Sequence, residues 1–288
     1  MSRPPFLTLP SGARALRLST ARGEFAVHDA RPARSSRGTV LLVPGFTGSK
    51  EDFIALLEPL AAAGFRAVAV DGRGQHESRG PRDEAAYAQD ELARDLLAQA
   101  TALADGAGPV HVLGHSLGGL IARAAVLRSP AAFASLTIMS SGPAAIAPPQ
   151  QTRTKLLIDA LSTMDMESVW QAMRELDPPE AADEVTPPGV RDFLHTRWMG
   201  TVPEQLMATG RQLNGEPDRV GELAATALPK HVLSGEVDYA WPVPLMDAMA
   251  ERLSAHRTVI EGAEHSPNAE RPHPTADALV RFWESIAP

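Results

Sequence analysis

One short segment has residue types and spacing that are suited to catalysis: Gly114-His115-Ser116-Leu117-Gly118. It fits the pattern G-x-S-x-G and lies between an apolar run and a helix-like segment. A sharp turn from a buried strand into a helix strains the backbone of its central residue, usually with positive φ. Strand and helix approach so closely there that the two flanking glycines can carry no side chain. A glycine-rich turn with an incidental serine is the alternative, but this setting favours a nucleophile. We expect the Ser116 hydroxyl to lie above the sheet at a helix N-terminus, where the N–H of Leu117 can donate to an oxyanion.

A serine nucleophile requires two further groups. Its hydroxyl is a weak nucleophile at neutral pH and needs a base within hydrogen-bond reach. Imidazole can take the proton and return it to the leaving group, and a carboxylate on its other nitrogen fixes the tautomer. The chain has nine histidines and no cysteine. We expect His115, inside the motif, to point away from the pocket. His111 and His231 lie in expected strands as core or surface residues, and His195 and His273 have no motif around them, so we expect these four not to be the base.

Short apolar runs alternate with helical patterns through most of the chain. This alternation predicts an α/β protein with a largely parallel sheet and right-handed crossovers, and an antiparallel pair at its start. The expected strands are residues 14–20, 24–30, 38–45, 65–74, 108–116, 133–142, 230–235 and 257–263. The expected helices between them are residues 50–64, 87–104, 117–129, 244–253 and 274–286.

The alternation breaks after Gly142, where helix-like segments separated by proline pairs replace it. We interpret residues 146–227 as an inserted helical cap, or lid. The core is then expected to comprise residues 1–145 and 228–288.

Composition restricts the classes of function. The 288 residues are 44% hydrophobic and 22% charged with a net charge of −8, which argues for a globular protein with a small-molecule ligand and against a nucleic-acid partner. We find neither a signal peptide nor an apolar run long enough to span a membrane, so we expect no integral membrane segment and a cytoplasmic location. The oligomeric state is left open.

The chain resembles the α/β-hydrolase superfamily over nearly its whole length. The resemblance implies an α/β-hydrolase fold, with a mostly parallel eight-stranded sheet flanked by helices and an inserted helical cap. The segment "SGEVDYAWP" is similar to the family's G-x-x-D loop and implies Asp238 as the acid, with Glu236 the nearest rival. The segment "EGAEHSPNAERP" is similar to the histidine loop and implies His265 as the base. The chain order Ser–Asp–His matches the family.

Two other loops resemble family loops and depart from them. "VPGFTGSKED" is similar to the "HGFTGS" type, which implies the backbone N–H of Phe46 as the second oxyanion-hole donor, although Pro44 stands where the family usually has histidine. The Phe46 ring is alternatively, or additionally, a pocket wall. "DGRGQHES" resembles D-x-R-G-x-G-x-S, with His76 replacing the second glycine. We expect His76 to be a structural loop residue.

Apolar residues of the insert suggest a substrate pocket. Trp198 and Met199 are our candidates for its walls, together with Trp241 beside the acid. The alternative is that such residues pack the cap helices together. No histidine spacing indicates metal ligands, so we expect no metal and no cofactor.

The expected function is that of a serine hydrolase. We expect cleavage of a carboxylic ester of an apolar acyl substrate through an acyl-enzyme intermediate, as in carboxylesterases and lipases with a Ser-His-Asp triad. Relatives with the same trio include thioesterases, lactonases and C–C bond hydrolases, and some members of the fold bind a ligand without hydrolysing it. Since fold does not prove function, these alternatives stay open.

Overall fold

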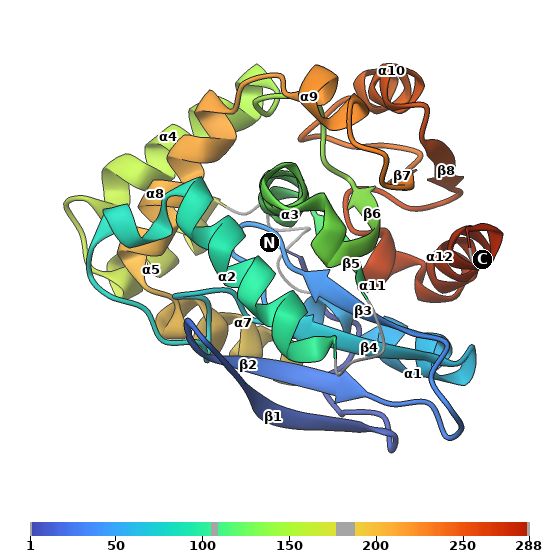
Figure 1. Cartoon of the computed structure of the whole chain (residues 1–288). Coiled ribbons are helices and arrows are strands. Elements are labelled where there is room, and N and C mark those ends of the chain that lie inside the picture. The colour runs from blue at the N-terminus through green and yellow to red at the C-terminus, as the bar shows by residue number, and fades with distance from the viewer. Residues whose placement is uncertain (1, 105–108, 177–187, 287–288) are drawn as a thin grey trace.

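The computed structural model describes residues 2–104, 109–176 and 188–286. Its centre is an eight-stranded sheet in the order β1-β2-β4-β3-β5-β6-β7-β8 (Figure 1). The first two strands pair antiparallel, β2 is antiparallel to β4, and the remaining pairs are parallel. The strands are β1 (Ala13–Thr20), β2 (Gly23–Ala30), β3 (Gly38–Val43), β4 (Phe65–Val70), β5 (Val110–His115), β6 (Phe133–Met139), β7 (Lys230–Gly235) and β8 (His256–Ile260). This confirms the predicted α/β-hydrolase fold with its mostly parallel sheet.

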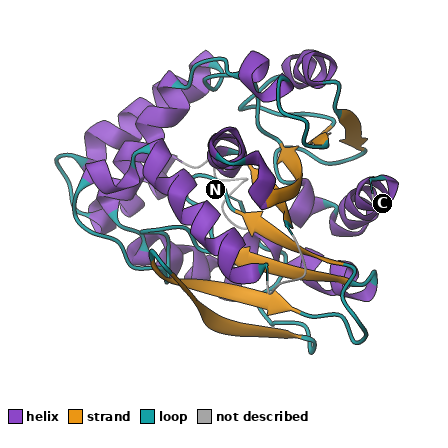
Figure 2. Cartoon of the chain, in the orientation of Figure 1, coloured by secondary structure: helices purple, strands orange, loops and turns teal. Residues whose placement is uncertain are grey.

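Helices cover both faces of the sheet, so the central strands are buried on both sides (Figure 2). One apolar cluster joins the sheet to α2, α3 and α10, and a second joins it to α1 and α12. The bounds are α1 (Ile54–Ala62), α2 (Gln89–Leu103), α3 (Leu117–Arg128), α10 (Val243–Leu253) and α12 (Pro272–Ser285). Every residue of β4 and β5 is buried, which explains why apolar residues occupy most positions on both faces of these strands, with Arg66, His111 and His115 as polar exceptions.

Two elements differ in their bounds from their sequence patterns. The expected strand 65–74 ends at Val70 because Asp71 opens a loop in which Gly74 adopts φ 72°. The expected helix 50–64 begins as a 3₁₀ turn, η1 (Lys50–Phe53), before α1. Both departures lie beside the carboxyl edge of the sheet. There, backbone N–H groups of the loops donate to side chains, as Lys50 does to Asp71 and Gly72 to Gln75.

A group of helices lies between β6 and β7. Among the described residues it includes α4 (Pro148–Leu161), α5 (Met166–Leu176), α7 (Pro188–Gly200), α8 (Pro203–Gly215) and α9 (Val220–Ala224). Residues of α4, α5, α7 and α8 form an apolar cluster of their own, here called the cap cluster: Leu161, Val169, Trp170, Val190, Leu194, Trp198 and Leu206. The division into a core (1–145 and 228–288) and a cap (146–227) stays a prediction.

The parallel register brings the ends of neighbouring strands to one edge. Val43 at the end of β3 pairs with Gly114 of β5, and Gly114 pairs with Ile138 of β6. The loops that follow these strands therefore meet at the carboxyl edge, where α/β proteins bind ligands. None of the described helices is both long enough and apolar enough to cross a bilayer.

Candidate active site

Ser116 lies on the turn between β5 and α3. Its backbone has φ 54° and ψ −121°, outside the regions that L-residues normally occupy. A Cβ on Gly114 would overlap the backbone of Gly118, and one on Gly118 would overlap the carbonyl oxygen of Val43. The close approach anticipated from the sequence is therefore present, and only glycine fits at both positions.

The loop after β3 packs against this serine. A Cβ on Gly45 would lie 3.0 Å from the Ser116 Cβ, so the backbone preceding Phe46 is in direct contact with the turn. The Gln75 amide donates to the Gly45 carbonyl oxygen at 3.0 Å and holds the loop in place. The Phe46 side chain is half-buried and packs against both the main core and the cap cluster. Of the two proposed oxyanion donors, Leu117 follows Ser116 directly in the chain, and Phe46 follows Gly45, whose backbone contacts the serine turn.

His265 and Asp238 are hydrogen-bonded to each other. The distance from His265 Nδ1 to Asp238 Oδ2 is 2.8 Å, and both residues are buried. The other carboxylate oxygen, Oδ1, accepts the backbone N–H groups of Ala240 at 2.7 Å and Trp241 at 3.0 Å. The rival Glu236 instead accepts the N–H of Gly262 at 2.7 Å. Of the two carboxylates, Asp238 is the one on the imidazole.

His115 connects the serine turn to the histidine loop. Its Nε2 lies 2.7 Å from the His265 carbonyl oxygen, and the two rings are 5.0 Å apart. A carbonyl can only accept, so Nε2 carries the proton. Burial, reinforced by the neighbouring His265, lowers the pKa of His115 to about 3, so its ring stays neutral. Within the described residues the Ser116 hydroxyl and the His265 ring are not hydrogen-bonded, and such contacts often tighten only when substrate binds.

The three candidate pocket residues lie in different settings. Trp198 is almost fully buried in the cap cluster, and its indole N–H donates to the Met166 carbonyl at 2.7 Å. Met199, the next residue, is 43% exposed. Trp241 is fully buried, donates to the Ala144 carbonyl and lies with its ring 6.5 Å from that of His265. Trp241 is therefore the one in contact with the histidine; a role for any of them in substrate binding stays a prediction.

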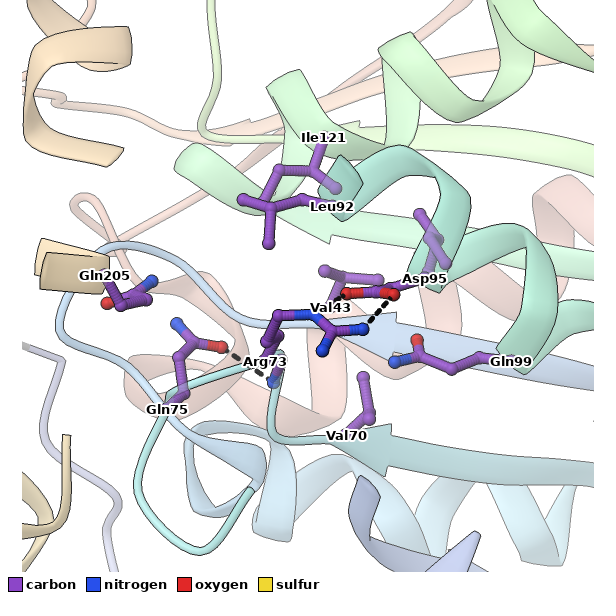
Figure 3. A pocket seen from close by; sticks show the side chains of 11 residues that line it. Val43, Val70, Arg73, Gln75, Leu92, Asp95, Gln99, Ile121 and Gln205 are labelled. Carbon is purple, nitrogen blue, oxygen red and sulfur yellow. Dashed lines mark hydrogen bonds and ion pairs between the residues drawn. The ribbon is translucent and has the colours of Figure 1, made fainter. Parts of the chain in front are cut away.

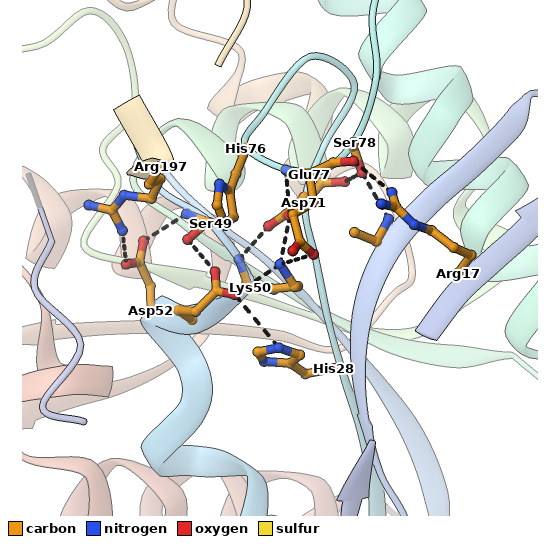
Figure 4. A network of polar contacts seen from close by, with 12 residues as sticks. Arg17, His28, Ser49, Lys50, Asp52, Asp71, His76, Glu77, Ser78 and Arg197 are labelled. Atoms are coloured by element: carbon orange, nitrogen blue, oxygen red, sulfur yellow. Dashed lines mark hydrogen bonds and ion pairs between the residues drawn. The ribbon is translucent and has the colours of Figure 1, made fainter. Parts of the chain in front are cut away.

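A polar network that sequence patterns did not reveal supports the loop after β3 (Figure 4). The buried Lys50 ammonium lies 2.9 Å from a carboxylate oxygen of each of Glu51, Asp71 and Glu77. Burial alone would lower the pKa of Lys50, but Asp71 and Glu51 outweigh it and hold the pKa above its usual value. Burial raises the pKa of Asp71 to about 7 despite the ammonium. The sequence signal for this network was limited to the aspartate that opens the D-x-R-G loop.

The same network contains a contact between α7 and η1. Arg197 of α7 donates to Asp52 Oδ1 at 2.7 Å, and both side chains are fully buried. His76, at φ 42°, packs its ring against Phe193 of α7 with centroids 5.5 Å apart. Helix α7 thus contacts η1, which follows the loop after β3, and the loop after β4.

A separate cavity of about 30 Å³ lies between the sheet, α2, α3 and α8 (Figure 3). The Arg73–Asp95 ion pair, at 2.6 Å, lies along it. Its volume suits one or two water molecules and is well below the several hundred Å³ that small-molecule sites occupy. Across the described parts of the chain, no group of three or more histidine, aspartate or glutamate side chains could hold a metal ion.

Comparisons with known proteins agree with this architecture. The family model described as alpha/beta hydrolase fold matches residues 38–173. A Variovorax paradoxus (strain S110) protein provisionally named carbamate hydrolase RutD is 37% identical over 102 residues, 35% of this chain and 37% of that protein. The match thus spans little more than a third of that relative.

Two longer likenesses cover most of the chain. The 2-hydroxy-6-oxononadienedioate/2-hydroxy-6-oxononatrienedioate hydrolase of Paraburkholderia xenovorans (strain LB400) is 27% identical over 236 residues, 77% of this chain and 78% of that protein. The structure of a thermophilic esterase from Thermogutta terrifontis has a TM-score of 0.75 at 22% identity, covering 96% of this chain and 100% of that one. The protein therefore has the α/β-hydrolase fold, and its residues 38–173 match the family model of that description.

Proposed function

We propose that this protein is a serine hydrolase that cleaves carboxylic esters of apolar acyl substrates through an acyl-enzyme. The observation that carries the proposal is the hydrogen bond between His265 and Asp238, held by His115 against the turn that bears Ser116. A strained serine, a buried imidazole and a carboxylate on its far nitrogen are what nucleophilic acyl transfer requires.

In the proposed mechanism the Ser116 oxygen attacks the ester carbonyl while His265 Nε2 takes the hydroxyl proton. Asp238 holds the Nδ1–H tautomer and stabilises the imidazolium that forms. The N–H groups of Phe46 and Leu117 donate to the negatively charged oxygen of the tetrahedral intermediate. The imidazolium then protonates the departing alcohol, and the acyl group stays on the serine. Water attacks the acyl-enzyme by the same sequence of proton transfers and releases the acid.

A fluorophosphonate probe tests the nucleophile directly. We expect the wild-type protein to be labelled and to hydrolyse short p-nitrophenyl esters, and we expect Ser116→Ala to do neither. Ser254→Ala is a matched control because Ser254 also has positive φ, at 49°, but lies at the end of α10. That variant should label like wild type. Failure of the wild-type protein to label over a broad pH range would contradict the proposal and favour a non-hydrolytic, ligand-binding member of the fold.

Carbon–carbon bond hydrolysis is the second candidate, favoured by the likeness to the Paraburkholderia enzyme over 77% of this chain. Both reactions place negative charge on an oxygen near the serine, so the site does not separate them. A panel of purified substrates does: a chain-length series of esters, with thioesters, lactones, carbamates and a 2-hydroxy-6-oxo-dienoate. We expect the highest kcat/KM for an ester; a dienoate preferred by more than tenfold would transfer the assignment to the second candidate.

A further inference from the structure

Tyr239 occupies a distinctive position beside the proposed base. It follows Asp238 directly, and the two backbone bonds that Asp238 Oδ1 accepts from residues 240 and 241 fold the chain into a tight turn. Asp238 is buried by this turn, whereas Tyr239 is 53% exposed. The short-range geometry of the turn therefore sets the place of the tyrosine.

The Tyr239 ring lies over the imidazole of His265. The two centroids are 4.8 Å apart with the planes inclined at 43°. Trp241 and His115 lie farther from the same imidazole, at 6.5 Å and 5.0 Å, and both are buried. Tyr239 is therefore the half-exposed member of a set of three rings around the histidine.

A cation within about 6 Å of an aromatic ring is attracted by the negative face of the ring. The His265 ring becomes a cation during the proposed reaction, when Nε2 takes the serine proton. His115 cannot supply this stabilisation because its contact with a protonated neighbour is repulsive. The charged groups around the pair are Asp238 on the imidazole, Glu264 and Glu270 in the histidine loop, and Arg153 of α4, all of which act on the Tyr239 hydroxyl.

We propose that Tyr239 is a positioning residue: its ring covers the solvent side of His265 and favours the imidazolium over the neutral ring. This rests on the proposed function only for its kinetic consequence, since the effect on the imidazole exists whether or not the protein hydrolyses esters. The ring, and not the hydroxyl, carries the effect. Burial and nearby Asp238 raise the pKa of Tyr239 to about 12, so the phenol stays neutral throughout the working pH range.

The test is an NMR titration of ring-labelled His265, identified by its loss in His265→Gln. We expect Tyr239→Leu to lower the His265 pKa by about 0.4 to 0.7 pH units, as expected for losing one exposed cation–π contact. Tyr239→Phe should keep the wild-type value. Val237→Ala is the matched control, since Val237 also flanks Asp238 and is exposed. An unchanged pKa in Tyr239→Leu, or an equal drop in Tyr239→Phe, overturns the proposal.

The kinetic arm separates this inference from the proposed function. In Tyr239→Leu we expect the acid limb of kcat/KM to move to lower pH and the plateau to fall about two- to fivefold, with Tyr239→Phe near wild type. If wild type is inert to esters and to the fluorophosphonate but the NMR shift is present, the proposed function fails and this inference stands. If wild type is active and the Tyr239→Leu pH profile is unchanged, this inference fails alone.

Discussion

Replacing Asp238 with asparagine should disable the base while leaving the fold intact, because of the hydrogen bonds that its two carboxylate oxygens make. Oδ1 of Asp238 accepts two backbone N–H groups, and an amide nitrogen cannot accept either of them. The asparagine must therefore keep its oxygen there and turn its NH₂ group toward His265 Nδ1, which lies 2.8 Å from Oδ2 in the wild-type protein. That NH₂ group donates, so Nδ1 has to accept and the imidazole proton moves to Nε2.

The nitrogen that should accept the serine proton is then already protonated. Trapping a triad histidine in the wrong tautomer costs about 10⁴-fold in kcat, which corresponds to about 5 kcal/mol of transition-state stabilisation. We expect a loss of this size for Asp238→Asn with p-nitrophenyl esters at pH 7, with the midpoint of urea unfolding nearly unchanged because the side chain keeps its shape and its two backbone bonds.

Glu236→Gln is the control, because Glu236 lies two residues away on the same loop and its carboxylate bonds only the Gly262 N–H among the described contacts. It should stay within about threefold of wild type, as surface substitutions usually do. The reasoning would be refuted if Asp238→Asn kept more than a tenth of the wild-type kcat, or if Glu236→Gln lost as much.

Three further predictions concern stability and the serine turn. A Cβ on Gly118 would overlap the backbone at the end of β3, so Gly118→Ala should greatly reduce soluble yield and fluorophosphonate labelling. Gly221→Ala should reduce neither, because a Cβ on Gly221 would meet no atom within 4 Å. Arg197→Met leaves the fully buried Asp52 without its ion-pair partner and should lower the free energy of unfolding, measured with urea, by about 3–5 kcal/mol. The double variant Arg197→Met/Asp52→Asn should recover part of this loss. Equal losses in the single and double variants would contradict the ion-pair explanation. Burial lowers the pKa of His231 to about 3, so the unfolded chain, titrating near 6.5, binds the proton first and stability falls as the pH drops below that value. His231→Gln should flatten this decline by up to about 1.4 kcal/mol per pH unit between about pH 6 and 4, measured by urea titration, and an unchanged slope would show that His231 does not contribute.

The sequence by itself determined the sheet and the serine turn. The central strands are short and mostly apolar because they are buried on both faces, so burial leaves a direct compositional signal. The turn at Ser116 is equally visible, because a close backbone approach excludes every side chain and leaves glycine at 114 and 118. Local sterics and local burial act over a few residues, and a few residues of sequence are enough to detect them.

Which carboxylate meets the histidine was decided only by the tertiary structure. Glu236 and Asp238 lie on one loop, and the position of β8 and its following turn directs the first to Gly262 and the second to His265. The resemblance to known loops favoured Asp238, but no property of the two residue types by themselves separates them.

The polar contacts around the site were likewise beyond sequence patterns. Arg197 and Asp52 are 145 positions apart and become a buried pair only because α7 packs over η1. Tyr239 reaches His265 across 26 positions because two strand ends share one edge of the sheet. Such contacts depend on how whole elements are placed against one another, and a buried charge or an exposed ring has no sequence period that identifies its partner.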